Sequence, residues 1–475
     1  MAFSLPASVS QLISRLESAG YEAYAVGGCV RDMICGRTPH DWDLCTSAMP
    51  WETKACFPDC TVLTIGEKHG TITVLWNGEP YEITTYRVDG TYTDCRRPEE
   101  VTFVRSLEED LRRRDFTMNA MAYHPERGLV DLCGGRDDLA AGVLRCVGDP
   151  ERRFSEDALR ILRGLRFAAC YRLALELETA AAAVRLAPLL GRIAVERIDI
   201  EFQKLLLADG DAAAEILRQY PTVWNTIFPE FLPMQQCPQH NPYHQYDVWE
   251  HTLHVLENAP RDIILRWSAL LHDVGKPACR FTGADGIDHF YGHAEKSAEM
   301  SRQILRRLHA DHTRIHDVCT LVAHHDMPLS DSPRFMRRLL AKLGETQVRR
   351  LLALKRADDA GKADGVLERR EAQWTAAENC LEQLLAENAC LRVKDLAVGG
   401  ADLLALGIPQ GKQIGKILHM LLEQVLDDKL PNEREVLLHA VVPVTREITQ
   451  TLRKKKPGSM TRPGCVSRAT AIPRA

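Results

Sequence analysis

Two carboxylates near the start of the chain, Asp41 and Asp43, have the type and spacing to hold metal ions. In a short β run, side chains at i and i+2 project from one face, so both acids are expected opposite Trp42. Hard oxygen ligands of this kind suit Mg²⁺ bound to a triphosphate. Two metals ~3.5–4 Å apart can activate an attacking hydroxyl and stabilise a leaving pyrophosphate, with no protein nucleophile. An isolated Asp-X-Asp is more often a solvated strand face, so the interpretation depends on its neighbours.

A glycine pair lies upstream of these acids. Gly27-Gly28 is expected between a strand and a helix that carries Arg31, where backbone N–H groups can approach a phosphate closely. Alone the pair is typical of a turn; together with Arg31 and the two acids it favours a nucleotide site. Glu82, on a later predicted strand, could be a third carboxylate, but an ordinary exposed glutamate fits equally well, so Glu82 stays outside the expected set.

An arginine-rich segment follows, with thirteen Arg and no Lys between residues 104 and 172. Arginine presents a planar fork that matches phosphates and base edges, which a lysine cannot do. Arg113, Arg114, Asp115 and Asn119 are expected on a strand-to-helix connection. There Arg114 could hold a triphosphate and Asn119 a ribose hydroxyl.

A stripe of polar residues continues this segment in FSEDALRILRGLRF, for which Ser155 is the expected N-cap. Asp157, Arg160, Arg163 and Arg166 recur every three residues, opposite an apolar face. Acids in a first helical turn are also explained by the helix dipole alone. However, an Asp acceptor beside an Arg donor matches the pairing edges of cytosine and adenine and rejects those of uracil and guanine. Protein side chains could therefore replace a nucleic-acid template.

Histidines gather in a second region, with twelve of seventeen between His240 and His325. Mixed imidazole and carboxylate ligands suit Mn²⁺, Fe²⁺, Co²⁺, Ni²⁺ or Zn²⁺ rather than Mg²⁺ alone. The His272-Asp273 pair, with Gly275-Lys276 after it, an upstream His and a downstream Asp, resembles the HD phosphohydrolase domain. That resemblance implies four main metal ligands: His251, His272, Asp273 and Asp358.

Three further histidines of this region, His293, His324 and His325, could bind a second metal or a phosphate, although polar helix ends explain them nearly as well. A metal-bound hydroxide would attack a phosphomonoester or a cyclic phosphodiester. A retained scaffold without activity is an alternative for the whole region. Nearer the C-terminus, Lys412 and Lys416 follow Gly-rich turns and could contact a nucleic-acid backbone, although a plain helical hairpin fits as well.

The elements that must position these residues change along the chain. Apolar spacing predicts a helix over 8–20, and β-rich runs are expected at 24–26, 42–44, 61–65, 71–76 and 81–86. From residue 155 the pattern is helical. The 475-residue length indicates several domains, and no apolar stretch approaches the ~20 residues needed to span a membrane. The N-terminus lacks signal-peptide features and the fifteen cysteines lack zinc spacing, so a reduced, cytoplasmic protein is expected.

Residues 21–207 resemble the class II tRNA nucleotidyltransferases, the bacterial CCA-adding enzymes of the polymerase-β-like superfamily. The matching segments, in order, are VGGCVRDMICGRTPHDWDLCTS, YEITTYRVDGTYTDCRRPEEVTFVRSLEEDLRRRDFTMNA, VDLCGGRDDLAAGVLR, GDPERRFSEDALRILRGLRF and VERIDIEFQKLLL. The resemblance implies that Gly28, Arg31 and Arg114 contact the nucleotide and that Asp41 and Asp43 hold Mg²⁺.

The same resemblance assigns base reading to Asp157, Arg160, Arg163 and Arg166, in agreement with the donor and acceptor argument. In such enzymes a flexible loop helps the change from CTP to ATP, and TYTDCRRP at 91–98 resembles it, which argues against a relative that adds only CC. Bacterial poly(A) polymerases share this head, but their basic and aromatic segment after the Asp-X-Asp strand is not matched by TIGEKHGTITVLW.

The expected fold is an α/β polymerase-β-like nucleotidyltransferase head followed by an all-α neck, HD domain and helical tail. The expected domains are a head at 1–150, a neck with the base-reading helix at 151–228, an HD domain at 229–362, a tRNA-binding helical tail at 363–452 and a basic disordered segment at 453–475. A net charge of −5 excludes a uniformly basic RNA-binding surface but not an RNA substrate.

The expected function is template-independent addition of C, C and A to the 3′ end of tRNA from CTP and ATP, with Mg²⁺ as cofactor and an added transition metal in the HD domain. The near alternatives are an A-adding tRNA nucleotidyltransferase and a bacterial poly(A) polymerase. Two alternatives of other classes are a phosphohydrolase with an RNA-binding head and a non-catalytic RNA-binding protein. Intact Asp41 and Asp43 weigh against both. The sequence leaves the oligomeric state open.

Overall fold

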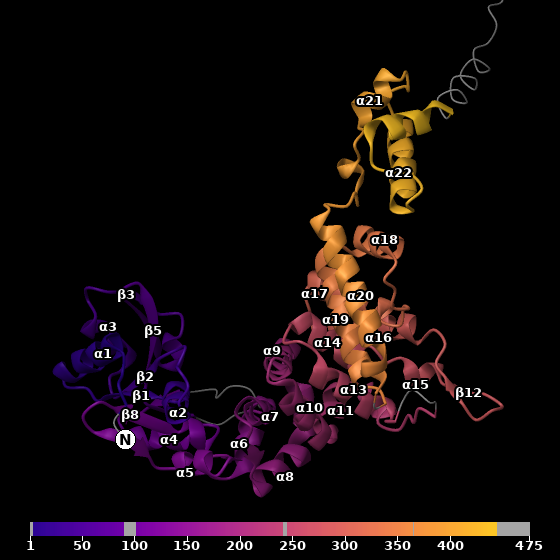
Figure 1. Cartoon of the computed structure of the whole chain (residues 1–475). Coiled ribbons are helices and arrows are strands. Elements are labelled where there is room, and N and C mark those ends of the chain that lie inside the picture. Colours follow the sequence, from indigo (N-terminus) through magenta and orange to yellow (C-terminus); the bar gives the residue numbers. More distant parts are fainter. Residues whose placement is uncertain (1–2, 90–100, 241–244, 364, 444–475) are drawn as a thin grey trace, which may run out of the picture. The chain divides into compact units, whose positions relative to one another are not determined.

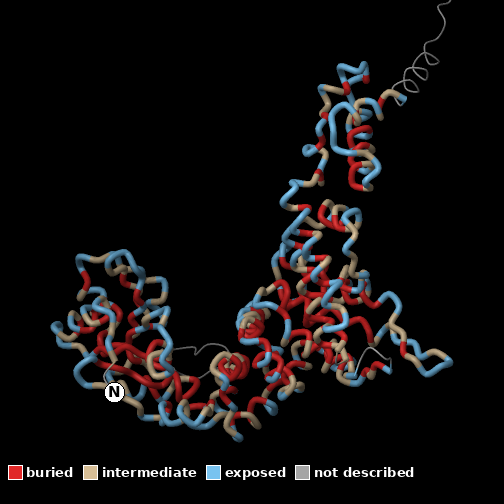
Figure 2. The backbone as a smooth tube through the Cα atoms, viewed as in Figure 1, coloured by how far each residue is buried: buried red, intermediate tan, exposed pale blue. Residues whose placement is uncertain are grey.

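The computed structural model describes residues 3–89, 101–240, 245–363 and 365–443. The chain divides into two compact units, Met1–Met327 with Arg349–Arg370, and Pro328–Val348 with Glu371–Ala475. Figure 1 shows the elements of both units, and Figure 2 shows that buried backbone follows the sheet and the packed helices. The expected domain boundaries stay predictions. The expected loop at 91–98 and the basic segment at 453–475 lie outside the described residues.

The first unit opens with a seven-stranded sheet in the order β3-β4-β5-β2-β1-β8-β9. β2 and β5 are parallel, and the other neighbours in the sheet are antiparallel. The strands are β1 Ala23–Val26, β2 Asp43–Thr46, β3 Thr61–Leu63, β4 Thr71–Trp76, β5 Glu79–Thr85, β8 Met121–His124 and β9 Gly128–Asp131. The predicted α/β head is therefore confirmed, and each of the five expected β runs overlaps one of the strands β1 to β5.

Helices and short turns complete this head. α1 forms where the sequence predicts it because its apolar positions recur on one face, and Val9, Leu12 and Leu16 are fully buried against the sheet. The other elements are α1 Ala7–Ser18, α2 Gly28–Ile34, α3 Pro50–Cys56, η1 Glu67–His69, β6 Arg87–Asp89, β7 Val101–Phe103, α4 Leu107–Arg112, η2 Thr117–Asn119, α5 Gly135–Ala140 and β10 Val143–Leu144.

The helix expected to begin at Ser155 is instead two helices, α6 Pro150–Glu156 and α7 Leu159–Tyr171. The Asp149 carboxylate caps α6 and Pro150 is its first residue, an earlier start signal than Ser155. Ser155 is therefore inside α6, and its expected role as an N-cap was wrong. The backbone at Asp157 is extended, with φ −141° and ψ 102°, and it interrupts the helix. It precedes α7 rather than occupying its first turn.

The rest of the first unit is helical, as predicted. An aromatic core joins its successive helices: the Phe202 ring lies 4.8 Å from that of Phe228 and 5.1 Å from that of Trp267. The elements are β11 Ala174–Leu175, α8 Leu177–Leu186, η3 Ala187–Arg192, α9 Val195–Leu206, α10 Gly210–Gln219, α11 Pro221–Ile227, α12 Phe231–Met234, α13 Val248–Asn258, α14 Ile263–Leu271, α15 Lys276–Cys279, β12 Phe281–Thr282, β13 Asp288–His289, α16 His293–Arg307, α17 His312–His324 and α19 Glu345–Ala360.

The second unit has its own apolar core, in which Leu421, Leu403 and Leu437 are fully buried. Arg334 and Arg338 of α18 pair with Asp427 after α22. Its elements are α18 Pro333–Leu343, the end of α20 Val366–Ala386, η4 Val393–Asp395, α21 Gly400–Ala405 and α22 Lys412–Leu426. Across the described parts of both units, no helix is long and apolar enough to cross a membrane.

Candidate active site and a buried histidine cluster

A cavity of about 360 Å³ in the first unit brings together five of the predicted site residues: Asp43, Arg114, Asp157, Arg160 and Arg163. Its walls come from strands β2 and β5, from residues 113–115 after α4, from the start of α7 and from Arg197 of α9. The predicted Gly28, Arg31, Asp41 and Arg166 are not among the residues that line it. The cavity therefore joins the expected metal-binding end of the site to most of the expected base-reading stripe.

Asp43 is the first residue of β2, whereas Asp41 lies before the strand. The expectation that both acids occupy one β run was wrong for Asp41, because pairing with β5 begins at Asp43. Both acids remain exposed. Partial withdrawal from water raises the pKa of Asp43, the neighbouring Glu82 raises it further, and Arg114 offsets them only in part.

Glu82 is the residue that reasoning from the sequence left out. It pairs directly with Asp43 in the parallel register between β2 and β5 and lines the same cavity. Its neighbours Tyr81 and Ile83 are buried while Glu82 is exposed, the same alternation that Asp43 and Leu44 show. That alternation could have placed Glu82 on the exposed face, but the register that sets it beside Asp43 is a long-range fact.

Gly27 and Gly28 connect β1 to α2, and at Gly27 the backbone passes close to Arg114. Gly27 has φ +77°, and a Cβ built on it would lie 3.1 Å from Nη1 of Arg114. Gly28 begins α2, and Arg31 on that helix is buried, donating from Nη1 to Asn119 Oδ1 at 2.7 Å. The Arg31 guanidinium also lies 4.4 Å from the centre of the Tyr171 ring. Arg31 therefore braces the head against α7.

Arg114 is held in place by a buried acid, Asp110, from α4. The Asp110 carboxylate accepts from Nη2 of Arg114 at 3.0 Å and from Nη2 of Arg113 at 2.7 Å. Burial opposes ionisation of Asp110, but the two guanidinium groups outweigh it and lower its pKa. Arg114 is thus a fixed cation at the wall of the cavity.

Two arginines of the stripe expected to read bases, Arg160 and Arg163, are also paired with protein carboxylates. Arg163 donates to Asp115 Oδ2 from Nε and Nη2 at 2.9 and 2.7 Å, and Arg160 donates to Glu156 at 2.7 Å. Although burial opposes ionisation, Arg163 and its hydrogen bonds lower the pKa of Asp115 to about 2. The stripe residues inside the cavity are therefore already oriented before any ligand binds.

The remaining members of the stripe turn toward α9. Arg166 donates from Nε to Glu201 at 2.6 Å and lies 3.9 Å from the centre of the Phe167 ring. Asp157 accepts the Leu159 N–H at 3.1 Å and Nη2 of Arg197 at 3.0 Å. Arg197, which the sequence did not single out, lines the cavity as well.

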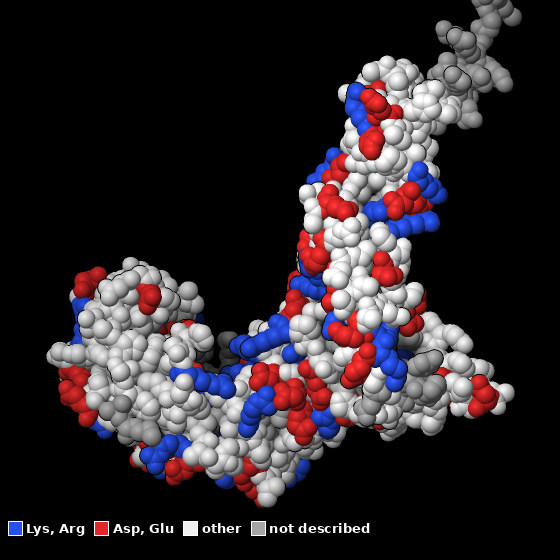
Figure 3. All heavy atoms as spheres, in the orientation of Figure 1, with Lys and Arg blue, Asp and Glu red and all other residues white. Residues whose placement is uncertain are grey.

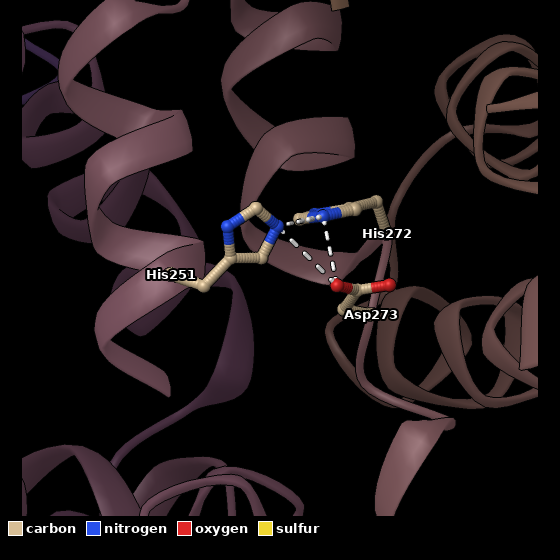
Figure 4. Close-up of side chains that lie close together, drawn as sticks. All are labelled: His251, His272 and Asp273. Carbon is tan, nitrogen blue, oxygen red and sulfur yellow. Dashed lines mark hydrogen bonds and ion pairs between the residues drawn. The ribbon is translucent and has the colours of Figure 1, made fainter. Parts of the chain in front are cut away.

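A second set of predicted residues converges in the helical part of the same unit. His251 comes from α13, and His272 and Asp273 come from the end of α14; Figure 4 shows their rings and carboxylate pointing toward one another. The two Nε2 atoms are 3.3 Å apart, and Nε2 of His272 is 3.1 Å from Asp273 Oδ2. Asp358 of α19 places Oδ1 3.1 Å from Nε2 of His251. All four expected ligands therefore meet at one point.

The charges at this cluster depend on one another. Burial lowers the pKa of His251. Burial acts the same way on His272, but the adjacent Asp273 carboxylate outweighs it and raises that pKa. Burial opposes ionisation of Asp273, and His272 and Lys276 overcome it, so the pKa of Asp273 lies well below its usual range. The carboxylates are thus ionised and available as ligands.

The other histidines of the region separate into two kinds. His293 and His325 are buried beside Asp273 and form a second His/Asp group with it. His324 instead bonds through Nδ1 to the Thr320 carbonyl at 2.7 Å, within its own helix. Lys412 and Lys416 are exposed on the first turns of α22 in the second unit.

Three family models match the chain. They describe a poly A polymerase head domain at residues 23–145, an RNA- and SrmB-binding site of polymerase A at 150–234 and a tRNA nucleotidyltransferase domain 2 at 289–441. A CCA-adding enzyme of Levilactobacillus brevis is 37% identical over 436 residues, which cover 90% of this chain and 96% of that enzyme. The chain belongs to the CCA-adding enzymes.

Other CCA-adding enzymes support this assignment at different lengths. The match to that of Leuconostoc mesenteroides is 54% identical over 206 residues, 43% of this chain, and spans about half (50%) of the relative. The solved CCA-adding enzyme of Bacillus stearothermophilus in complex with CTP is 28% identical with a TM-score of 0.68, covering 94% of this chain and 98% of that structure. The first unit and the second thus share their fold with CCA-adding enzymes.

Proposed function

We propose that this chain adds C, C and A to the 3′ end of tRNA, using CTP and ATP and releasing pyrophosphate at each step. The observation that carries the proposal is the 360 Å³ cavity, which is lined at once by Asp43, Glu82, Arg114 and the base-reading Asp157 and Arg160. The cavity suits a nucleoside triphosphate, because Arg114 can bind the phosphates while Asp157 and Arg160 can bind the base. The names of this chain's relatives support the same activity.

In this reaction the tRNA 3′-hydroxyl oxygen forms a bond to the α-phosphorus, and the bond from that phosphorus to the pyrophosphate oxygen breaks. Asp41 and Asp43 would hold Mg²⁺, which supplies charge neutralisation at the phosphates. The raised pKa of Asp43 beside Glu82 fits a carboxylate pair that gains a cation. Arg114, fixed by Asp110, would bind the triphosphate as a preformed fork.

Asp157 and Arg160, which line the same cavity as Asp43 and Arg114, would select the base. The Asp157 carboxylate offers only acceptors, and Arg160 offers only donors. Cytosine and adenine both present an amino donor beside a ring nitrogen acceptor, so both satisfy the pair. Gly28 and Arg31 would support the nucleotide from outside the cavity lining, and Arg166 would orient α7 through Glu201.

The direct test gives purified protein a tRNA that ends before CCA, with CTP, ATP, UTP and GTP separately and together. We expect CC with CTP alone and CCA with CTP and ATP. No addition to this tRNA, together with addition of A to a tRNA that ends in CC, would instead identify the A-adding alternative, and long A tracts would identify the poly(A) alternative. Incorporation of UTP or GTP as efficient as that of CTP would refute base reading by Asp157 and Arg160.

A separate variant tests the assignment of Asp41 as a metal ligand. Asp41→Ala should abolish addition and leave tRNA binding largely intact, since the acid acts on the triphosphate rather than on the tRNA. Asp59→Ala is the matched control, because Asp59 is an exposed acid of the same head that pairs with Arg15. Turnover retained by Asp41→Ala would remove this residue from the metal site. The expected cytoplasmic location stays a prediction.

A second function is favoured by the buried cluster of His251, His272, Asp273 and Asp358. We infer a metal-dependent phosphohydrolase site of the HD type, because mixed imidazole and carboxylate ligands suit Mn²⁺, Fe²⁺, Co²⁺, Ni²⁺ or Zn²⁺. All four groups present ligand atoms within 3.8 Å of a neighbour in the cluster. Each of His251 and His272 is oriented through Nδ1 by a backbone carbonyl, which leaves Nε2 for a metal.

This activity is measurable as hydrolysis of p-nitrophenyl phosphate and bis-p-nitrophenyl phosphate with each of these metals. The double change His272→Ala and Asp273→Ala should eliminate hydrolysis. His254→Ala is the control, since His254 lies one turn from His251 on α13 but pairs with Glu257 at 2.8 Å. Hydrolysis that survives the double change would exclude the cluster as its source.

A further inference from the structure

A second cavity in the head has a volume of about 580 Å³. Among the described residues, it has no lining residue in common with the cavity at Asp43 and Arg114. Its walls come from the end of α2 with Cys35 after it, from the start of the edge strand β9, from α5 and from Phe3 near the N-terminus. The volume is in the range of small-molecule sites, roughly 300–1,000 Å³. Neither the proposed nucleotidyl transfer nor the buried histidine cluster uses these residues.

The lining of this cavity is mostly apolar. Phe3, Ile34, Leu129 and Leu139 contribute large side chains to it. Each of the four is only half-buried and packs with one flank against the apolar core of the head. Large apolar side chains that stay partly open to water around one concavity are typical of a ligand site rather than of ordinary surface. An apolar group placed there would leave water together with them, which favours binding.

Hydrogen bonds hold the walls of the cavity in place. The Tyr123 hydroxyl accepts the Phe3 N–H at 2.9 Å and donates to the Phe3 carbonyl at 3.0 Å, which fixes the N-terminal wall. On the side of α5, the Thr117 hydroxyl donates to Asp138 Oδ2 at 2.7 Å. Gly135, the first residue of α5, leaves no room for a Cβ beside the Thr117 carbonyl, so helix and backbone are in close contact. A ligand would therefore enter a preformed site, and little binding free energy would be spent on ordering it.

A single charge lies among these apolar groups. Of the described residues that line the cavity, Arg136 alone is charged. Its Nη2 lies 3.5 Å from Asp137 Oδ1, and the two side chains are 65% and 83% exposed. An exposed pair of this kind contributes little free energy, so the guanidinium can exchange Asp137 for a ligand carboxylate. Its planar fork matches that carboxylate in shape and charge.

We propose that this cavity binds an apolar monocarboxylate, with the apolar part against Phe3, Ile34, Leu129 and Leu139 and the carboxylate on Arg136. The site is separate from the proposed nucleotidyl transfer and does not depend on it. An acyl chain and an aromatic acid share the required chemistry. For an acyl chain, each CH₂ group that becomes buried should lower Kd by about fourfold until the cavity is full.

The test is calorimetric titration of the full-length chain with octanoate, decanoate and dodecanoate, each kept below the concentration at which it forms micelles. We expect one site per chain and a fall in Kd of about 15-fold for each two-carbon step. Indole-3-acetate, titrated in parallel, distinguishes the two sources: if it binds more tightly than all three chains, and through Arg136, the ligand is an aromatic acid.

The charge is tested with decanol, which has the same chain without the carboxylate. Decanol should bind at least about tenfold more weakly than decanoate, because it loses a charge-assisted hydrogen bond. Arg136→Gln should remove most of that difference. Arg112→Gln is the matched control and should keep it, since Arg112 is an exposed arginine of the same head that pairs with Glu108 at 2.9 Å and lies outside the lining.

Two further measurements locate the ligand. Cys35 lines the cavity, so decanoate should slow its alkylation by iodoacetamide, followed by peptide mass spectrometry, while Cys133 of the same head, outside the lining, keeps its rate. Ala140 lines the cavity from the exposed end of α5, so Ala140→Phe should fill the space without disturbing the core and weaken binding.

The proposal is overturned if none of the carboxylates binds, or if both Ala140→Phe and Arg136→Gln leave binding unchanged. It is also overturned if the chain sediments as a dimer that Ala140→Phe dissociates, because a second copy of the chain would then occupy the cavity.

Discussion

Asp157 gives the sharpest prediction for nucleotide choice. Its carboxylate lines the cavity beside Arg160, accepts the Leu159 N–H at 3.1 Å and accepts Nη2 of Arg197 at 3.0 Å. The lone pairs that remain can only accept. Uracil would present a carbonyl oxygen to Asp157 and a ring N–H to Arg160, so two polar groups would lose their partners.

The cost of that mismatch can be worked out. Each unsatisfied polar group costs about 1–3 kcal/mol, so the wild-type chain should prefer CTP over UTP by about 2–6 kcal/mol, roughly 30-fold to 20,000-fold in kcat/KM. In Asp157→Asn, the amide oxygen can still accept the Leu159 N–H, while the amide nitrogen becomes a donor and the hydrogen bond from Arg197 is lost. One mismatch disappears, and the preference for CTP should fall by roughly 5- to 150-fold.

The assay is single-nucleotide incorporation into a tRNA that ends before CCA, with kcat/KM measured for CTP and for UTP. Asp149→Asn is the matched control, because Asp149 also accepts a backbone N–H two residues ahead, from Glu151 at 3.0 Å, but caps α6 instead of lining the cavity. A CTP to UTP ratio that stays within twofold in Asp157→Asn would refute the donor and acceptor reasoning. An equal fall in Asp149→Asn would attribute the effect to helix capping.

Three more outcomes follow from the head. Glu82→Gln should lower the rate of CTP incorporation at saturating CTP by at least about tenfold, or ~1.4 kcal/mol, because it removes the carboxylate that pairs in register with Asp43, a proposed metal ligand. An unchanged rate would show that Glu82 is an ordinary strand residue. The pKa of Asp115, about 2 against an unfolded 3.8, stabilises the fold by about 2 kcal/mol above pH 4, and this contribution is lost as the pH falls through 2. Asp115→Asn should therefore unfold at lower urea concentration at pH 7, and the difference from wild type should shrink toward pH 2. Gly27→Ala and Gly20→Ala both strain a positive φ, but only at Gly27 would the new Cβ meet Arg114, so only Gly27→Ala should raise KM for CTP.

The sequence predicts the residue types of the site better than their local structure. Asp157, Arg160 and Arg163 of the polar stripe line one cavity, as their period of three predicts, but Arg166 lies outside its lining and the break at Asp157 was missed. There Asp149 and Pro150 provide a stronger start signal than Ser155. A local pattern can nominate a helix, but two overlapping start signals compete, and the outcome depends on packing.

Pairing between strands that are far apart in the sequence cannot be predicted from such local patterns. Nothing local sets Glu82 beside Asp43, since that contact depends on a parallel register between strands separated by other elements. The buried cluster of His251, His272, Asp273 and Asp358 was predictable for a different reason. The His272-Asp273 pair is a local motif, whereas the position of Asp358 opposite His251 came from the resemblance rather than from spacing.

Five guanidinium groups that line the proposed nucleotide cavity each pair with an acid of the same chain: those of Arg113, Arg114, Arg160, Arg163 and Arg197. Figure 3 shows the same intermixing of basic and acidic side chains on the visible face. When basic side chains neutralise the phosphates of a polyanion, the cations condensed on that polyanion are released, and the affinity falls steeply with salt. Here carboxylates of the same chain already neutralise these guanidinium groups. We therefore expect nucleotide affinity at this cavity to change little with ionic strength. We also expect other polyanions to bind there only weakly.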